Sequence, residues 1–131
     1  MGHYFINDPT LASNKKQISY TFLGKELTFL TDNGVFSKDR VDFGTNVLLN
    51  SLEDLKDIKS ALDVGCGVGI IGLSIAKKYN NINVDLIDVN ERAINLTKEN
   101  INKNKLTNCN CFLSNIYENV NKKYDLIIYF L

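Results

Sequence analysis

A run of four glycines, spaced two or three residues apart, is the feature of this sequence best suited to holding a ligand. The stretch LDVGCGVGIIG, residues 62–72, contains Gly65, Gly67, Gly69 and Gly72. Glycine has no Cβ, so a ligand can approach the backbone N–H groups of such a loop closely. Asp88 ends the next apolar run, and its carboxylate can accept hydrogen bonds from two ribose hydroxyls. The combination predicts a nucleoside-binding site. The alternative is a tight strand-to-helix turn with Asp88 as a helix cap.

The identity of the nucleoside depends on Asp63, which precedes the glycines in LDVGCG. Residues 67–72, GVGIIG, match the dinucleotide fingerprint G-x-G-x-x-G, which is a weak signal on its own. A carboxylate at the mouth of the loop would repel a pyrophosphate and attract a positively charged amino-acid end, directly or through water. S-adenosylmethionine has such an end, together with a ribose and an adenine. The sequence therefore favours S-adenosylmethionine, and an NAD-binding oxidoreductase domain is the alternative.

The elements that must position these residues follow from the apolar pattern. From residue 60 onwards, short apolar strands alternate with helices, which is typical of a parallel sheet. The expected strands are SALDVG, INVDLID, NCNCFLS and YDLIIYFL, and the expected helices are 69–79 and 90–104, the second capped by Asn90. We expect a parallel α/β sheet with helices on both faces and right-handed crossovers. The ligand would lie beyond the carboxyl ends of the strands.

A β-hairpin is predicted before this core. QISYTFLGKELTFLTDNG alternates apolar and polar residues around Gly24. A helix is then expected to begin at Thr45 or Asn46, either of which can cap it. The 131 residues are enough for one domain. We therefore expect a single domain, 1–131, made of an N-terminal arm and hairpin, 1–44, and a cofactor-binding core, 45–131.

Composition and charge narrow the classes of partner. Fifteen basic and fifteen acidic residues balance, so no overall field attracts nucleic acid. No apolar run approaches the roughly 20 residues of a membrane helix, and MGHYFINDPT lacks the features of a signal peptide. We expect a cytoplasmic protein without membrane contact. The odd number of cysteines, Cys66, Cys109 and Cys111, favours reduced thiols over disulfides. Since the chain has one histidine, we expect no metal site.

Several motifs, in order along the chain, resemble a known family. LDVGCGVGIIG resembles the first motif of class I S-adenosylmethionine-dependent methyltransferases. Four further stretches resemble the methyltransferase small domain, as in the bacterial ribosomal RNA small-subunit guanine-N2 methyltransferase C group. They are HYFINDPT, GKELTFLTDNGVFSKDRVDFGTNVLL, DVNERAI and KYDLII. The resemblance implies a partial Rossmann-like sheet with the strand order 3-2-1-4. It also implies methyl transfer from S-adenosylmethionine to an exocyclic amine of guanine in ribosomal RNA.

The same resemblance implies roles for individual residues around the cofactor. The methionine end would be held by Asp63, Gly65, Cys66, Gly67 and Gly69. Asp88 would bind the ribose, and Val89 would lie beside the adenine. These roles place the methionine end and the ribose at the carboxyl ends of the first two strands of the core, and the adenine toward the third strand.

Further candidates lie outside these two segments. Asn115 stands where the family often has Asp near the adenine amino group, and its amide oxygen is still an acceptor. A loop Asn at a turn is the alternative. FSKDRVDFGT resembles the segment that closes over the cofactor, so Phe36, Gly44 and Thr45 are candidates. The alternative is that Phe36 and Phe43 are core aromatics and Thr45 a helix cap.

The pattern of the family breaks at the end of the sequence. In the family the fourth strand leads into Asn-Pro-Pro, whose Asn accepts hydrogen bonds from the target amine, but here Tyr129, Phe130 and Leu131 stand in that region. We expect a C-terminally incomplete domain that lacks the catalytic motif, and a non-catalytic cofactor-binding module is an alternative. A truncated chain, a frameshifted gene and a genuine short protein all fit. The apolar strand 124–131 would be an edge, so we expect self-association through it or cover from the hairpin.

Overall fold

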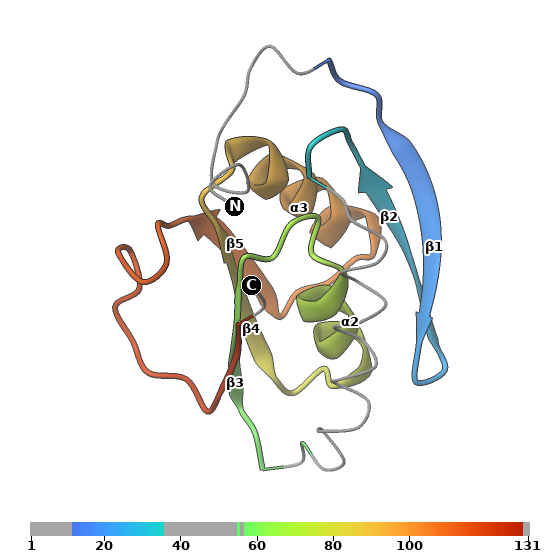
Figure 1. Ribbon diagram of the computed structural model, residues 1–131. Helices are drawn as coiled ribbons and strands as arrows, with labels where there is room; N and C mark the ends of the chain where they lie inside the picture. Colours follow the sequence, from blue (N-terminus) through green and yellow to red (C-terminus); the bar gives the residue numbers. More distant parts are fainter. Residues whose placement is uncertain (1–11, 36–54, 56, 130–131) are drawn as a thin grey trace.

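The structure, a computed structural model, describes residues 12–35, 55 and 57–129 (Figure 1). Phe36, Gly44 and Thr45 lie outside the described residues, as do most of the helix predicted to begin at Thr45 or Asn46 and the last two residues, 130–131. Leu55, described on its own, is buried. The roles predicted for Phe36 and Thr45 therefore stay predictions.

A parallel sheet of four strands forms the centre of the described fold. Its strands are β3 (Ser60–Val64), β4 (Asn83–Asp88), β5 (Cys109–Leu113) and β6 (Leu126–Tyr129). They lie in the order β5-β4-β3-β6, and every neighbouring pair is parallel. This is the predicted order 3-2-1-4, so the expected sheet is confirmed. Because the strands are parallel, their carboxyl ends gather at one edge of the sheet.

Two helices connect these strands. The helix α2 (Ile70–Lys78) leads from β3 to β4, and α3 (Glu91–Lys103) leads from β4 to β5. Asn90 caps α3 as predicted, because its side chain accepts the N–H groups of Arg92 and Ala93. Both connections step along the sheet in the same direction, so right-handed crossovers place both helices on one face. The sequence predicted helices on both faces, and the third expected helix, which begins at Thr45 or Asn46, lies mostly outside the described residues.

The predicted hairpin consists of β1 (Lys16–Phe22) and β2 (Lys25–Thr31), paired antiparallel. Its turn residues Leu23 and Gly24 both have positive φ, 48° and 82°, the pattern of the tight type I′ turn. The hairpin lies on the outer side of α2 and α3, so the helices stand between it and the four-stranded sheet (Figure 1). The described molecule thus has three layers.

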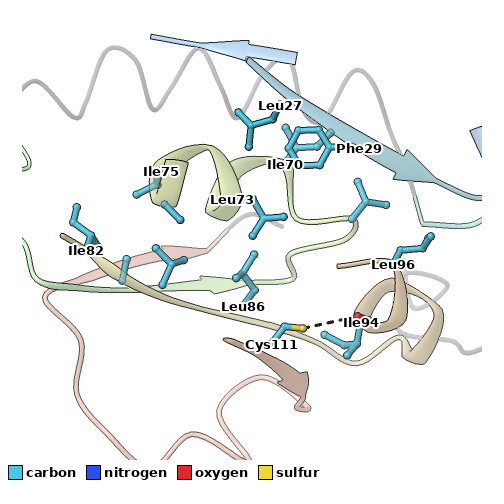
Figure 2. Close-up of a cluster of buried hydrophobic side chains, with 14 of the residues drawn as sticks. Leu27, Phe29, Ile70, Leu73, Ile75, Ile82, Leu86, Ile94, Leu96 and Cys111 are labelled. Atoms are coloured by element: carbon cyan, nitrogen blue, oxygen red, sulfur yellow. Dashed lines mark hydrogen bonds between the residues drawn. The ribbon is translucent and has the colours of Figure 1, made fainter. Parts of the chain in front are cut away.

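One apolar core joins these layers. Leu27 and Phe29 of the hairpin are buried against Ile70 and Leu73 of α2, and Leu86 of β4 continues the same cluster below the helices (Figure 2). The remaining members of this cluster include Val68, Ile75, Ile82, Val84, Ile94, Leu96 and Cys111. A second, smaller cluster of Leu62, Val64 and Ile87 lies on the other side of the sheet. The hairpin is therefore part of the main core rather than an appendage.

The expectation that the hairpin would cover the last strand is wrong. The hairpin packs on α2 and α3, because Leu27 and Phe29 find their apolar partners there. In the described part of the chain β6 is an edge strand that pairs with β3, and its Ile127 and Tyr129 are exposed. Self-association through residues 124–131 stays a prediction, which sedimentation of the chain at several concentrations would test.

Asn100 of α3 and Asn104, the C-cap of the same helix, hold the hairpin by hydrogen bonds to the backbone of β2. The Asn104 side chain accepts the Thr28 N–H at 2.9 Å and donates to the Thr28 carbonyl at 2.8 Å. The Asn100 side chain accepts the Leu30 N–H at 2.7 Å and donates to the Leu30 carbonyl at 3.0 Å. A side-chain amide has the same donor and acceptor as a peptide group, so it satisfies a strand edge that would otherwise be unpaired.

In the described part of the chain, no helix is both long and apolar enough to cross a membrane.

Candidate functional site

The glycine loop follows directly from β3 and turns the chain into α2. Gly65, Gly67 and Gly69 have φ values of 74°, 60° and 94°, a region that residues with a Cβ rarely adopt. The N–H groups of Gly65 and Cys66 donate to the Ile87 carbonyl at 2.9 and 3.0 Å. The loop therefore lies across the carboxyl ends of β3 and β4, where the sequence predicted a ligand.

Asp88, the last residue of β4, joins this loop to the start of α3. Its Oδ2 accepts the Gly67 N–H at 2.9 Å, and its Oδ1 accepts the Asn90 N–H at 2.9 Å. The half-buried carboxylate is thereby fixed beside the glycines. An ionised carboxylate is an acceptor at both oxygens, which is the chemistry that two ribose hydroxyls require. The structure thus brings together the glycines and the acid that the sequence singled out.

Asp63 lies beneath the loop rather than at its mouth. Its side chain is buried, and its Oδ2 accepts the Gly72 N–H at 3.0 Å in the first turn of α2. Gly72 permits this approach, because a Cβ there would lie 2.8 Å from Asp63 Oδ2 and 2.6 Å from a Leu86 methyl carbon. The carboxylate takes one of the N–H groups with which a helix N-terminus would otherwise bind a phosphate. This position disfavours a pyrophosphate more directly than simple repulsion at the mouth of the loop.

Cys66 reaches the site with its main chain. Its sulfur lies 3.7 Å from the Thr97 hydroxyl of α3, so the side chain is turned toward that helix. Burial, followed by the negative charges of Asp63 and Asp88, holds the pKa of the Cys66 thiol well above its ordinary value. A neutral thiol that is half-buried against α3 is a packing group, so a ligand contact at Cys66 would come from its backbone.

The segment that leaves the hairpin lies against the glycine loop. A Cβ on Gly67 would be 3.3 Å from the Val35 carbonyl oxygen, a contact tighter than ordinary packing. Arg92 of α3 holds the same segment by donating to the Asn33 carbonyl at 3.0 Å. The sequence did not single out residues 33–35. The sequence feature that could have indicated them is the TDNG turn, which lies just before the segment predicted to close over the cofactor.

Val89 and Asn115 follow paired positions at the carboxyl edge of the sheet. Asp88 pairs with Leu113 of β5, and the Ser114 N–H donates to the Asp88 carbonyl at 3.0 Å. Val89 is half-buried, whereas Asn115 is exposed at the start of a turn. The structure therefore places both predicted residues on the same edge as the glycine loop. Ile116 and Tyr117 are exposed next to Asn115, and the apolar pattern of the sequence did not single them out.

The glycine loop and Asp88 provide the contacts that S-adenosylmethionine requires. The positive-φ glycines leave the backbone open where a Cβ would close it, and Asp88 supplies an acceptor beside them. Within residues 12–35, 55 and 57–129, no group of three or more potential metal ligands occurs. The residues present thus fit a nucleoside with a cationic end.

Comparison with known proteins places the chain in a family. The methyltransferase small domain family matches residues 26–129. The chain is 43% identical to the uncharacterized protein YbxB of Bacillus subtilis (strain 168) over 118 residues, which cover 90% of this chain and 59% of that protein. It is 33% identical to ribosomal RNA small subunit methyltransferase C of Psychromonas ingrahamii over 130 residues, 96% of this chain and 37% of the relative. The chain thus spans between about one third and three fifths of these relatives.

A solved structure gives the same result for the fold. The T. thermophilus 16S rRNA N2 G1207 methyltransferase (RsmC), in complex with AdoMet and guanosine, superposes with a TM-score of 0.74 at 25% identity. The match covers 91% of this chain and 32% of that protein. With matched motifs, the predicted strand order and a family match over most of its length, this chain belongs to the methyltransferase small domain family, whose members use S-adenosylmethionine.

Proposed function

We propose that this chain binds S-adenosylmethionine at the glycine loop as part of a methyltransferase that acts on an exocyclic amine of guanine in ribosomal RNA. One observation carries the cofactor proposal: within a loop of positive-φ glycines, the Gly67 N–H donates to the Asp88 carboxylate at 2.9 Å. This arrangement offers backbone groups and a ribose acceptor side by side. The RNA part rests on relatives named for ribosomal RNA methylation.

Each predicted residue has a distinct part in this proposal. The main chain of Gly65, Cys66, Gly67 and Gly69 lines the methionine end, and Asp88 accepts from the ribose. Val89 and Asn115 lie near the adenine end of the same edge. Asp63 contributes negative charge from beneath the loop, where it favours a cationic ligand over a phosphate. When bound, S-adenosylmethionine supplies an activated methyl group, and the residues of the chain bind and orient it.

The substrate part of the proposal requires a group that orients the target amine and basic side chains that bind RNA. Methyl transfer in line with the sulfonium needs an acceptor that orients the target amine, and the family's Asn-Pro-Pro is the expected source. The sequence does not contain Asn-Pro-Pro. The net charge is zero, so RNA binding would depend on local Lys and Arg side chains. The cytoplasmic location that the sequence predicts is part of the same proposal.

Calorimetric titration with S-adenosylhomocysteine, with NADH as the parallel ligand, tests the cofactor proposal. We expect S-adenosylhomocysteine to bind and NADH not to bind. Binding of NADH alone would overturn the proposal and favour the oxidoreductase alternative. A chain that binds neither ligand would also contradict it.

Transfer is tested separately, by incubating the chain with methyl-labelled S-adenosylmethionine and small ribosomal subunits that lack guanine-N2 methylation. Label in the RNA supports the enzyme. Cofactor binding without transfer supports the second candidate, a non-catalytic cofactor-binding module.

A further inference from the structure

The glycine loop is anchored from below by one face of α3. The Thr97 hydroxyl donates to the Gly67 carbonyl at 2.9 Å, and the Asn100 amide donates to the Val68 carbonyl at 2.8 Å. Both side chains are fully buried. Two consecutive carbonyls of the loop are therefore held by side chains that lie on α3, 30 and 32 residues further along the sequence.

Holding these carbonyls fixes the orientation of the loop. No cis peptide bond occurs in the described part of the chain, and in a trans peptide each C=O points opposite to the following N–H. The bonds to Gly67 and Val68 thus set two consecutive peptide planes. Glycine has more conformational freedom than any other residue, so without these two bonds the loop would be less ordered before the ligand binds. Ordering it on binding would cost free energy and so lower the affinity for the ligand.

Asn100 also joins the loop to the hairpin. Its amide nitrogen donates both to the Val68 carbonyl at 2.8 Å and to the Leu30 carbonyl at 3.0 Å, while its oxygen accepts the Leu30 N–H at 2.7 Å. An amide has two N–H donors and one carbonyl, so this set of partners satisfies the side chain. Aspartate has no donors, and serine cannot reach three partners. The docking of β2 and the shape of the loop therefore depend on one side chain.

We propose that Thr97 and Asn100 are positioning residues for the cofactor, and that Asn100 makes the hairpin part of the cofactor site. This inference rests on the proposed function for the identity of the ligand. Neither residue has to touch S-adenosylmethionine, because each acts through a carbonyl of the loop. The anchoring itself is a property of the protein without ligand and can be measured in that state.

Asn104 provides a matched control. It binds the Thr28 N–H and carbonyl of β2 as Asn100 binds those of Leu30, but its other partner is the Asn100 carbonyl of its own helix and not the loop. Asn100→Ala and Asn104→Ala thus both remove a bond pair to the hairpin, and Asn100→Ala alone also releases Val68. We expect Asn100→Ala to weaken S-adenosylhomocysteine binding by about tenfold, the equivalent of one buried hydrogen bond, and Asn104→Ala to weaken it by less than about twofold.

Thr97 gives a second pair that keeps the proposal testable if Asn100→Ala does not fold. Thr97→Val keeps the shape of the side chain and removes the donor to Gly67, whereas Thr97→Ser keeps the hydroxyl. We expect weaker binding from Thr97→Val and near-normal affinity from Thr97→Ser. Equal affinity of the two Thr97 variants, or an equal loss from Asn100→Ala and Asn104→Ala, would overturn the proposal.

Amide hydrogen exchange of residues 65–69, measured without ligand, separates this inference from the proposed function. We expect faster exchange in Asn100→Ala and Thr97→Val, with rates near those of the original protein in Asn104→Ala. If the original chain binds no S-adenosylhomocysteine but the exchange follows this pattern, the cofactor assignment fails and the anchoring stands. If the original chain binds and the exchange is uniform across the variants, the anchoring fails alone.

Discussion

The Oδ2 atom of Asp88 accepts the backbone N–H of Gly67 at 2.9 Å, across 21 residues of sequence. This bond brings the end of β4 to the middle of the glycine loop. A single carboxylate thereby shapes the loop and presents an acceptor beside it. Its removal should therefore affect both the ordering of the loop and the binding of a ribose.

Asp88→Ala is expected to weaken S-adenosylhomocysteine binding by about tenfold to a hundredfold, because hydrogen bonds to a charged acceptor contribute about 1.5–3 kcal/mol. Isothermal titration calorimetry measures the change. Asp85→Ala is the control, since Asp85 lies on the same strand but binds the Tyr124 hydroxyl at 2.6 Å and the Lys122 ammonium at 3.1 Å. Unchanged affinity in Asp88→Ala, or an equal loss in Asp85→Ala, would show that the ribose assignment is wrong.

Gly67→Val is expected to abolish cofactor binding. The new side chain would sit at a φ of 60° and within 3.3 Å of the Val35 carbonyl, on the loop that the ligand approaches. Gly24→Val is the matched control, because Gly24 has a φ of 82° in the hairpin turn and a Cβ there meets nothing within 4 Å. Thermal unfolding should show a loss of stability in both variants, of about 1–3 kcal/mol from backbone strain. A Gly67→Val protein that still binds the ligand would place the ligand elsewhere.

The Cys66 thiol is expected to stay protonated and unreactive at neutral pH. Burial first, and then the charges of Asp63 and Asp88, raise its pKa well above the ordinary value, and burial raises the pKa of Cys109 to about 12. Alkylation by iodoacetamide, followed by mass spectrometry of the peptides, measures both thiols. The same chain unfolded in denaturant should react fast at both positions and serves as the reference. Rapid labelling of Cys66 in the folded protein at neutral pH would contradict its placement against Thr97.

Acidification is expected to loosen the end of the hairpin through Asp32. Burial raises the pKa of this carboxyl, but hydrogen bonds from the Asn14 backbone, the Ser13 hydroxyl and the Asn33 backbone outweigh that effect, so the pKa lies below 3.8. A group whose pKa is lower in the folded than in the unfolded protein stabilises the fold above its unfolded pKa. That stabilisation is lost as the pH falls through the folded pKa.

The measurement for this prediction is the free energy of unfolding at neutral pH and below pH 3.8, compared with that of Asp32→Asn. The amide introduced by this substitution cannot ionise, so the variant should lose less stability than the original protein over that range. Its stability at neutral pH should be lower, because the amide has a single, neutral acceptor oxygen where the carboxylate accepts from Asn14 and Asn33 at one oxygen and from Ser13 at the other. Parallel acid dependence in the two proteins would contradict the assigned role of Asp32.

Local patterns in the sequence determined much of this architecture. The period-two alternation around Gly24 specified the hairpin, and Asn90 specified the start of α3. The alternation of strands and helices predicted a parallel sheet with one edge that carries both the glycines and Asp88, and the resemblance to the family supplied the strand order. Apart from that order, these features depend on neighbours in sequence, so a single sequence is enough to predict them.

The tertiary structure alone decided how that edge is supported. Asn100 binds Leu30 and Val68, which are 70 and 32 residues away, and no sequence period marks such a partner. Asp63 was expected at the mouth of the loop and lies beneath it, because Gly72 lets α2 pack close to β3. The hairpin covers α2 and α3 rather than β6, since that is where its apolar face is buried. Side-chain bonds to distant backbone groups and the choice between two apolar surfaces depend on three-dimensional packing, which local patterns do not encode.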